Sequence, residues 1–197
     1  MTLALRDNAY HTYADYLAWP EDVRYELIDG MAYLMAPAPG LEHQDIAGEI
    51  YFQLRRALEG KSCRAFIAPL DVRLPKGEDL DGQVDTVVQP DVLVVCDAEK
   101  LDRRGVRGAP DFVVEVLSPA TASHDYLLKR HAYERAGVRE YWLVHPADRM
   151  LTAYRLADGR YGEPVMQEFA GTTPVSVLPG VVIAWDHLVS RLPKPEP

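Results

Sequence analysis

The spacing of hydrophobic and polar residues changes along the chain, and the changes predict where helices and strands lie. Residues 43–58 repeat apolar side chains at helical spacing and stop before Gly60, which predicts a helix. Residues 123–136 do the same and stop at Gly137, which predicts a second helix. Shorter apolar runs predict strands, and these runs cover residues 63–74, 86–97, 111–118, 139–146 and 150–156.

Both ends of the chain add to this central pattern. A short helix is expected near residue 13, followed by a β-hairpin that turns at Asp29-Gly30 between "RYELI" and "MAYLM". Residues 181–188 end the folded part, after a second set of hairpin strands. The sequence thus predicts one domain over residues 1–190 and a flexible Pro-rich tail over residues 191–197.

The order of the central elements is helix, three strands, helix, strand. Runs such as "VLVV" and "FVV" are almost continuously apolar, which favours strands covered on both faces. We therefore expect an α/β domain with a central mixed sheet and added N- and C-terminal β-hairpins. A length of 197 residues fits a single domain of this kind.

Composition narrows the range of functions. The formal net charge of −9 argues against a protein that coats nucleic acid through bulk electrostatics, although it is compatible with an enzyme that meets phosphates through a metal. Cys63 and Cys96 are expected to be reduced residues of the core. No signal peptide or apolar run of membrane length is present, so a cytoplasmic protein without membrane contact is expected.

Two carboxylates stand in the predicted strands. Asp91 opens the strand in "QPDVLVV", and Glu115 interrupts the most apolar strand in "VVEVL". A buried carboxylate needs a partner, a metal or a proton. If the two strands pair, both acids can face one side, and hard oxygen ligands of this kind suit Mg²⁺. Alternatively, Asp91 caps a turn after Pro90 and Glu115 pairs with an arginine.

The second predicted helix directs a lysine towards the sheet. On a wheel at 100° per residue, Lys129 falls within the apolar arc that contains Leu128, Ala132 and Tyr133, next to Asp125. Lys129 can therefore pair with Asp125 four residues earlier, and it can also reach the Glu115 carboxylate.

The pattern also predicts the environment of two further polar residues. His43 falls on the apolar side of the first helix, where a lone histidine is more often a satisfied core residue than a ligand. Glu26 alternates with Tyr25 and Leu27, so it is expected to be an exposed strand residue.

Several segments together resemble the Uma2 family, a former domain of unknown function. They are "YELIDG", the helix that begins at His43, "QPDVLVV", "PDFVVEVLSPAT" and "DYLLKRHAYERAGVREYWLV". The family in turn resembles the PD-(D/E)xK superfamily of nucleases, which implies a restriction-endonuclease-like core.

The resemblance assigns roles to individual residues. The Pro-Asp of the superfamily motif matches Pro90-Asp91, and its (D/E)-x-K matches Glu115-Val116-Leu117, so that Leu117 replaces the usual lysine. The Uma2 pattern carries a lysine on the following helix instead, which is Lys129 here. Lys129 forms K-x-x-x-Y with Tyr133, and this resembles the Q-x-x-x-Y element of RecB-like nucleases. The resemblance also implies that Glu26 and His43 are supporting residues at the edge of the site, and Asp125 and Tyr133 of the second helix are expected to support it as well.

The activity implied is that of a metal-dependent endonuclease that hydrolyses phosphodiester bonds in DNA. Asp91, Glu115 and the Val116 carbonyl would hold Mg²⁺ or Mn²⁺, and Lys129 would complete the catalytic set. The loop at residues 100–110 is solvated or contacts the DNA backbone. A homodimer is expected. The alternatives are a catalytically silent nuclease-fold module for self-association or for nucleic-acid or protein binding, and a phosphodiesterase that acts on RNA or nucleotides.

Overall fold

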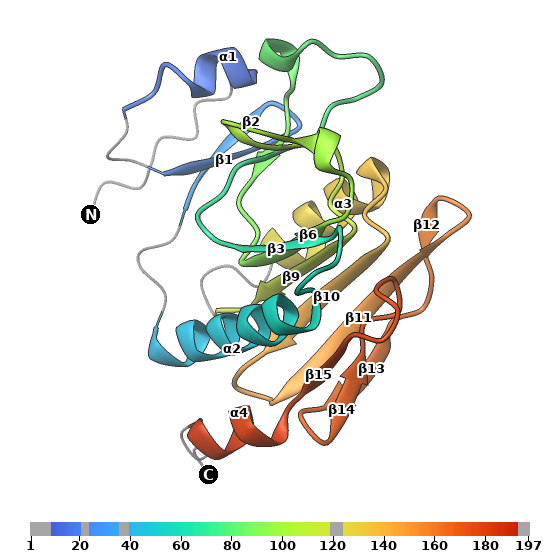
Figure 1. Ribbon diagram of the computed structural model, residues 1–197. Helices are drawn as coiled ribbons and strands as arrows, with labels where there is room; N and C mark the ends of the chain where they lie inside the picture. Colours follow the sequence, from blue (N-terminus) through green and yellow to red (C-terminus); the bar gives the residue numbers. More distant parts are fainter. Residues whose placement is uncertain (1–8, 21–23, 36–39, 119–123, 193–197) are drawn as a thin grey trace.

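Two large β-sheets, a two-stranded sheet, four α-helices and short helical turns make up the described part of the chain in the computed structural model, which covers residues 9–20, 24–35, 40–118 and 124–192 (Figure 1). The helical elements are α1 (Tyr13–Tyr16), α2 (Leu41–Ala57), the π-helix η3 (His124–Lys129), α3 (Arg130–Ala136) and α4 (Asp186–Arg191), with 3₁₀ turns η1 (Asp81–Gln83) and η2 (Ala98–Lys100).

The central sheet has the order β12-β11-β10-β9-β6-β3, and β13 pairs with β11 on the same edge as β12. Its strands are β3 (Arg64–Ile67), β6 (Val92–Val95), β9 (Phe112–Val116), β10 (Glu140–His145), β11 (Met150–Ala157), β12 (Arg160–Tyr161) and β13 (Val165–Glu168). The sheet is mixed, because β9 and β10 are parallel and the other pairs are antiparallel. The predicted core order corresponds to α2, β3, β6, β9, α3 and β10, which confirms the predicted α/β architecture with a central mixed sheet.

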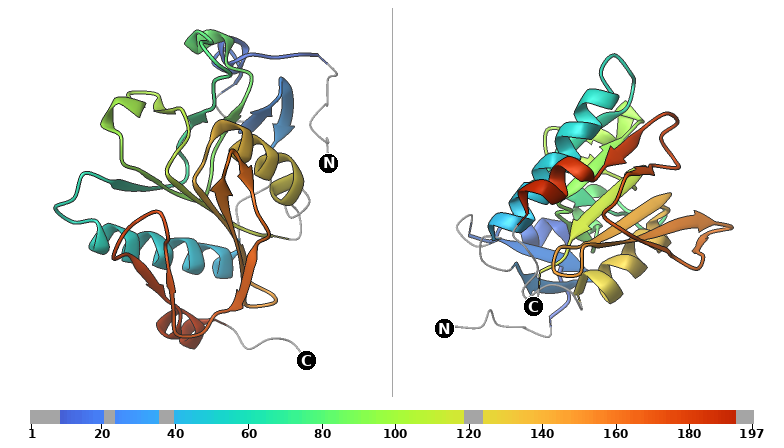
Figure 2. Two further views of the ribbon diagram at one scale, coloured as in Figure 1. Left: turned by 90° about the vertical axis from the view of Figure 1, so that its right-hand side faces the viewer. Right: turned by 90° about the horizontal axis from the view of Figure 1, so that it is seen from below.

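Helix α2 covers one face of this sheet, and the segment formed by η3 and α3 covers the opposite face (Figures 1 and 2). Ile46, Ile50 and Leu54 of α2 join one hydrophobic cluster with alternate strand residues such as Val92 and Val114. Ala132 and Tyr133 of α3 join a second cluster with the intervening strand residues. Both faces of the central strands are therefore buried, which explains their continuous apolar runs.

A second sheet of six short strands has the order β2-β1-β5-β4-β8-β7. Its strands are β1 (Tyr25–Ile28), β2 (Met31–Leu34), β4 (Val72–Arg73), β5 (Val87–Val88), β7 (Leu101–Asp102) and β8 (Gly105–Arg107). The predicted turn joins β1 to β2, and Asp29 and Gly30 have φ values of 49° and 77°. The residues expected to form a basic loop instead contain the β7–β8 hairpin. A separate hairpin of β14 (Thr172–Pro174) and β15 (Val182–Ala184) lies near the C-terminal helix.

Two predicted strands are each divided between the two sheets. Residues 63–74 form β3 in the central sheet and β4 in the second sheet, and residues 86–97 form β5 in the second sheet and β6 in the central sheet. The divisions fall at Pro69 and Pro90. Proline has no N–H to donate to a strand ladder, so each run stops pairing there and resumes in another sheet.

The second predicted helix is also divided. Residues 124–129 form a π-helix, and α-helix begins only at Arg130. Because a π-helix bonds each residue to the fifth along the chain, it turns less per residue than the 100° used to place the side chains. Leu128 therefore lies 36% exposed instead of in the apolar arc, whereas Lys129 is buried.

The expectation of two reduced cysteines is wrong. Cys63 and Cys96 form a disulfide, because Arg64 and Val95 are directly paired on β3 and β6 and the next residues outward therefore face each other. None of the helices in the described ranges has the length and apolar character needed to cross a membrane. The predicted tail falls mainly on residues 193–197, which lie outside the described residues.

Candidate active site

The predicted site residues lie where the chain passes from the second sheet to the central sheet. Gln89 and Asp91 flank Pro90 in the link between β5 and β6. Glu26 comes from β1 of the second sheet, and Glu115 comes from β9 of the central sheet. The split of the valine-rich run at Pro90 therefore places carboxylates from two sheets at one junction.

Glu115 is held by two side chains from the helical segment that covers its face of the sheet. Its carboxylate is 2% exposed. The Tyr133 hydroxyl donates a hydrogen bond of 2.7 Å to Glu115 Oε1, and Lys129 Nζ lies 3.0 Å from the same oxygen. The four-residue spacing of K-x-x-x-Y thus lets both side chains reach one carboxylate oxygen.

Lys129 also contacts a second buried carboxylate. Its Nζ lies 2.8 Å from Oε1 of Glu26, and both side chains are 5% exposed. Glu26 Oε1 additionally accepts a hydrogen bond of 2.8 Å from the backbone N–H of Gln89. The ammonium therefore bridges the two sheets, with one carboxylate from each.

The expected exposure of Glu26 is wrong, and the reason is the position of its strand. Period-two alternation predicts exposure only when one face of a sheet meets solvent. β1 lies between β2 and β5, and its last three residues are all buried. Gln89 was not predicted as a site residue. Its backbone N–H orients Glu26, and a backbone contact cannot be recognised from the type of residue that makes it.

Asp91 is oriented by the strand that carries Glu115. Its Oδ2 accepts a hydrogen bond of 2.8 Å from the backbone N–H of Val116, and it lies 3.1 Å from Nε2 of His43 at the beginning of α2. The Asp91 side chain is 19% exposed, so it is the most accessible carboxylate of the group. His43 Nδ1 is buried and has no hydrogen-bond partner among the described residues.

The structure describes the side chain of Leu117 but not that of Asp125. The side chain of Asp125 lies outside the described part of the chain, so its pairing with Lys129 stays a prediction. Leu117 is buried in the hydrophobic cluster that also contains Tyr133, on the Glu115 face of the sheet. It therefore occupies the strand position from which a lysine could approach the same site.

Carboxyl groups outnumber amines among the described side chains of this site. Glu26, Glu115 and Asp91 supply three carboxylates, whereas Lys129 supplies one ammonium. Burial raises the pKa of the Tyr133 phenol well above its ordinary value, and the neighbouring Glu115 and Glu26 carboxylates raise it further, so Tyr133 donates as a neutral hydroxyl.

The donor chemistry fits a magnesium ion in part. Within the described ranges, no three side chains of His, Cys, Asp and Glu are grouped as metal ligands. Mg²⁺ in phosphate-processing sites takes one or two protein carboxylates and fills its other positions with water and phosphate oxygens. Asp91, Glu115 and the Val116 carbonyl match that smaller set, and the excess negative charge favours a cation.

The fold and its core order are those of a restriction-endonuclease-like α/β domain. The chain belongs to the Uma2 family, whose description is "putative restriction endonuclease" and whose pattern matches residues 13–186. A similar solved structure is a "putative nuclease belonging to DUF820" from Anabaena variabilis, with 22% identity and a TM-score of 0.73. The match covers 92% of this chain and 99% of that chain. No curated protein matches the sequence.

Proposed function

We propose that the protein is a metal-dependent endonuclease that hydrolyses phosphodiester bonds in DNA. The observation that carries the proposal is the linkage of two acids to one segment of β9. Lys129 and Tyr133 both bind Glu115, and the next backbone N–H, that of Val116, binds Asp91. Membership of the Uma2 family, with its description as a restriction endonuclease, supports the same class of activity.

Asp91, Glu115 and the Val116 carbonyl would hold Mg²⁺ or Mn²⁺. When bound there, such an ion polarises a phosphate and lowers the pKa of a coordinated water. The Val116 N–H and His43 fix the orientation of Asp91 before any ion arrives. Tyr133 and Lys129 do the same for Glu115, and the Lys129 ammonium also supplies positive charge near developing negative charge on the phosphoryl oxygens.

Metal-dependent cleavage of supercoiled plasmid DNA tests the proposal. Asp91→Asn and Glu115→Gln should each lower the cleavage rate on the order of 10²–10³-fold, as is common when one preorganised group is lost from an active site. Glu99→Gln changes an exposed carboxylate away from the site and serves as the charge-matched control. Equal rates for all three variants and the wild type would place the chemistry elsewhere.

Moving the lysine from helix to strand tests the role of Lys129 in the same assay. Lys129→Ala should abolish cleavage, and adding Leu117→Lys should restore part of it, because Leu117 lies on the Glu115 face. Leu117→Lys alone would crowd two ammonium groups and should bring no gain. If the double variant stays as inactive as Lys129→Ala while its circular dichroism spectrum is native, the ammonium acts only from the helix.

A catalytically silent nuclease-fold module is the second candidate. The observation in its favour is that Lys129 contacts two carboxylates at once, which can serve purely to join the two sheets. Wild-type protein that binds DNA, yet leaves DNA, RNA and nucleotides intact with Mg²⁺ and Mn²⁺, would favour this module. Cleavage of RNA or nucleotides but not DNA would instead identify the phosphodiesterase alternative.

The homodimer stays a prediction. Cleavage of both strands of a duplex calls for two sites, and a two-fold dimer supplies them. Strands β2 and β13 are unpaired along one edge within the described residues, and an edge of this kind can pair with a second copy. Light scattering should give about twice the 22.1 kDa mass of the chain, and a mass equal to one chain at micromolar concentration would contradict the dimer.

A further inference from the structure

A basic pocket lies at the end of α2 opposite His43. It has a volume of about 420 Å³ and is lined by residues of the last turns of α2, the following turn and the start of β3. Four of the lining side chains are cations, and one is an acid. The cations are Arg55, Arg56, Lys61 and Arg64.

The four cations have no acid partner among the described residues, unlike many of the other basic residues. Arg73, Arg107, Arg135 and Arg191 each contact a carboxylate. In the described part of the chain, no carboxylate lies within ion-pair distance of Arg55, Arg56, Lys61 or Arg64, although Glu59 lines the same pocket. The chain has an overall charge of −9, yet four cations and a single acid line this one pocket, which gives it a local excess of positive charge.

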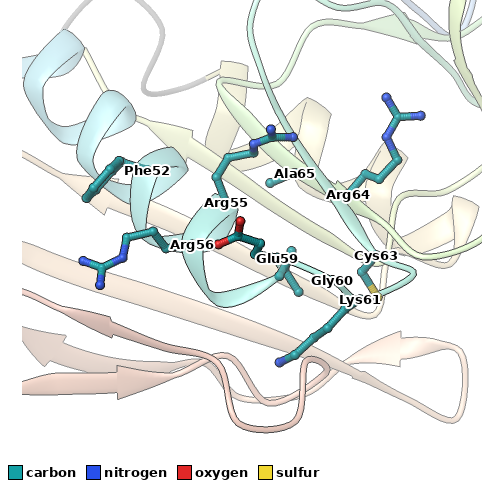
Figure 3. Close-up of a pocket in the computed structure, with 10 residues that line it drawn as sticks. Phe52, Arg55, Arg56, Glu59, Gly60, Lys61, Cys63, Arg64 and Ala65 are labelled. Atoms are coloured by element: carbon teal, nitrogen blue, oxygen red, sulfur yellow. The ribbon is translucent and has the colours of Figure 1, made fainter.

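Aromatic rings support two of these cations. The guanidinium of Arg64 lies 5.0 Å from the ring centre of Phe66, and that of Arg56 lies 5.9 Å from the ring centre of Phe52. Phe52 is 52% exposed. In Figure 3, Arg55 and Arg64 extend towards one side of the pocket, Arg56 and Lys61 extend towards the other, and Glu59 lies between them.

A simpler role explains only part of this arrangement. Cations in the last turn of a helix stabilise its negative end, and Arg55 and Arg56 occupy that position in α2. Lys61 and Arg64 lie beyond the end of the helix, so stabilisation of its negative end does not explain their positive charges. A second cavity, of about 620 Å³, shares Phe52 and Arg56 with the pocket and continues past Val182 to His187. The concave surface is therefore longer than the helix end, and its cations are concentrated in the first pocket.

We propose that this basic pocket binds the phosphate backbone of a nucleic acid at a distance from the candidate active site. The inference rests on the proposed function for its ligand. A positively charged groove with exposed aromatic rings is the arrangement that follows a nucleic-acid strand. His43 and Arg56 are thirteen residues apart on α2, which corresponds to about 20 Å at 1.5 Å per residue. A duplex strand lying along α2 would bring a phosphate roughly six nucleotides from the reacting bond to the pocket, since successive phosphates of a duplex strand rise about 3.4 Å along its axis.

Binding without cleavage tests the proposal. Fluorescence anisotropy of a labelled 20-nucleotide duplex and of the matching single strand, both in EDTA, measures affinity of the full chain when no metal is present. Arg56→Gln with Lys61→Gln should weaken binding and should lower the slope of log affinity against log salt by about 1 for each cation removed. Both variants replace exposed side chains without ion pairs among the described residues, so the fold should be retained.

The matched control is Arg160→Gln, compared with Arg56→Gln alone, because it removes the same single charge from an exposed position outside the pocket. Arg160→Gln should leave the salt slope within about 0.3 of the wild-type value, since bulk charge alone adds no phosphate contact. Equal weakening by Arg56→Gln and Arg160→Gln, or no binding by wild-type protein in EDTA, would overturn the proposal.

Phe52→Ala identifies the form of the nucleic acid. Loss of a stacking ring should lower affinity for the single strand about tenfold and leave the duplex affinity unchanged if bases stack there. If Phe52→Ala weakens binding of neither the single strand nor the duplex, while Arg56→Gln with Lys61→Gln still weakens binding, the pocket contacts a duplex backbone. If the protein binds nucleic acid through the pocket but cleaves nothing, the binding proposal stands and the endonuclease proposal fails. If the protein cleaves DNA but the pocket variants bind as tightly as the wild type, the endonuclease proposal stands and the binding proposal fails.

Discussion

Arg73 and Lys129 are both buried cations held by two carboxylates, but their partners differ in access to water. Arg73 is 0% exposed, and its partners Asp81 and Asp102 have side chains that are 32% and 48% exposed. Lys129 is almost as buried, and its partners Glu26 and Glu115 have side chains that are only 5% and 3% exposed. The first cluster keeps its negative charges in solvent, whereas the second takes all three charges into the interior.

The difference indicates different roles. Arg73 joins η1 and β7 through bonds of 2.6–2.7 Å and packs under Tyr13, and its partners remain hydrated. That arrangement is a structural clamp. Burying two carboxylates with one ammonium is costly, and well-packed apolar residues would often be as stable. Stability alone therefore gives no reason for a cluster of this kind, and the proposed endonuclease activity would supply one.

Lys129→Met should produce the largest loss of stability. Removal of one partner from a buried ion pair commonly costs about 3–5 kcal/mol, because the remaining charge has neither water nor a counterion. Here two carboxylates would lose their shared ammonium. Urea denaturation at pH 7 measures the change in free energy of unfolding. The double variant Lys129→Met with Glu26→Gln removes one of the two charges and should recover part of the loss, and no recovery would show that the carboxylates are not the cause.

Arg73→Met should have a smaller effect on the same measurement. Its carboxylate partners can return to water, so the expected loss is that of charged hydrogen bonds, about 1.5–3 kcal/mol. Arg73 Nε has no hydrogen-bond partner among the described residues, so methionine leaves no acceptor unpaired at that atom. A loss as large as that of Lys129→Met would mean that solvent exposure of the partners does not distinguish the two clusters.

The sequence was sufficient for the parts of the molecule that depend on local patterns. Asp29-Gly30 predicted the hairpin because both residues tolerate the positive φ that its turn requires. Helical spacing placed α2 within two residues of its observed beginning. The acids Asp91 and Glu115 could be selected because charges inside apolar strands need an explanation.

Local sequence patterns could not predict the features that depend on pairing between distant segments. The split of two strands between sheets depends on which partner each half meets after Pro69 or Pro90. The burial of Glu26 depends on β5 lying beside β1, and the disulfide depends on the register of β3 with β6. The π-helix before Arg130 changed which side chains face the sheet, so the wheel placed Lys129 inward but misplaced Leu128.

Asp102→Asn should give the smallest effect and should reveal the Arg73 clamp through its pH dependence. Hydrogen bonding from the Arg73 guanidinium lowers the pKa of Asp102, helped by the backbone N–H of Arg104, while partial burial opposes the shift. A carboxyl whose pKa is lower in the folded state stabilises the fold above its unfolded pKa, and this stabilisation disappears as the pH falls through the lowered folded value.

The difference in free energy of unfolding between wild type and Asp102→Asn should therefore be fully present at neutral pH and decline below the ordinary carboxyl pKa of 3.8. Because the Asp102 side chain is 48% exposed, solvent screening limits the difference to about 0.2–1 kcal/mol, and 1 M NaCl should reduce it. Urea denaturation at pH 7, 5 and 3 measures it, with Asp158→Asn as the control at an exposed turn. The Lys129→Met difference should respond much less to salt, since its charges are buried. Equal salt sensitivity of both variants would contradict the distinction between a hydrated clamp and a buried site.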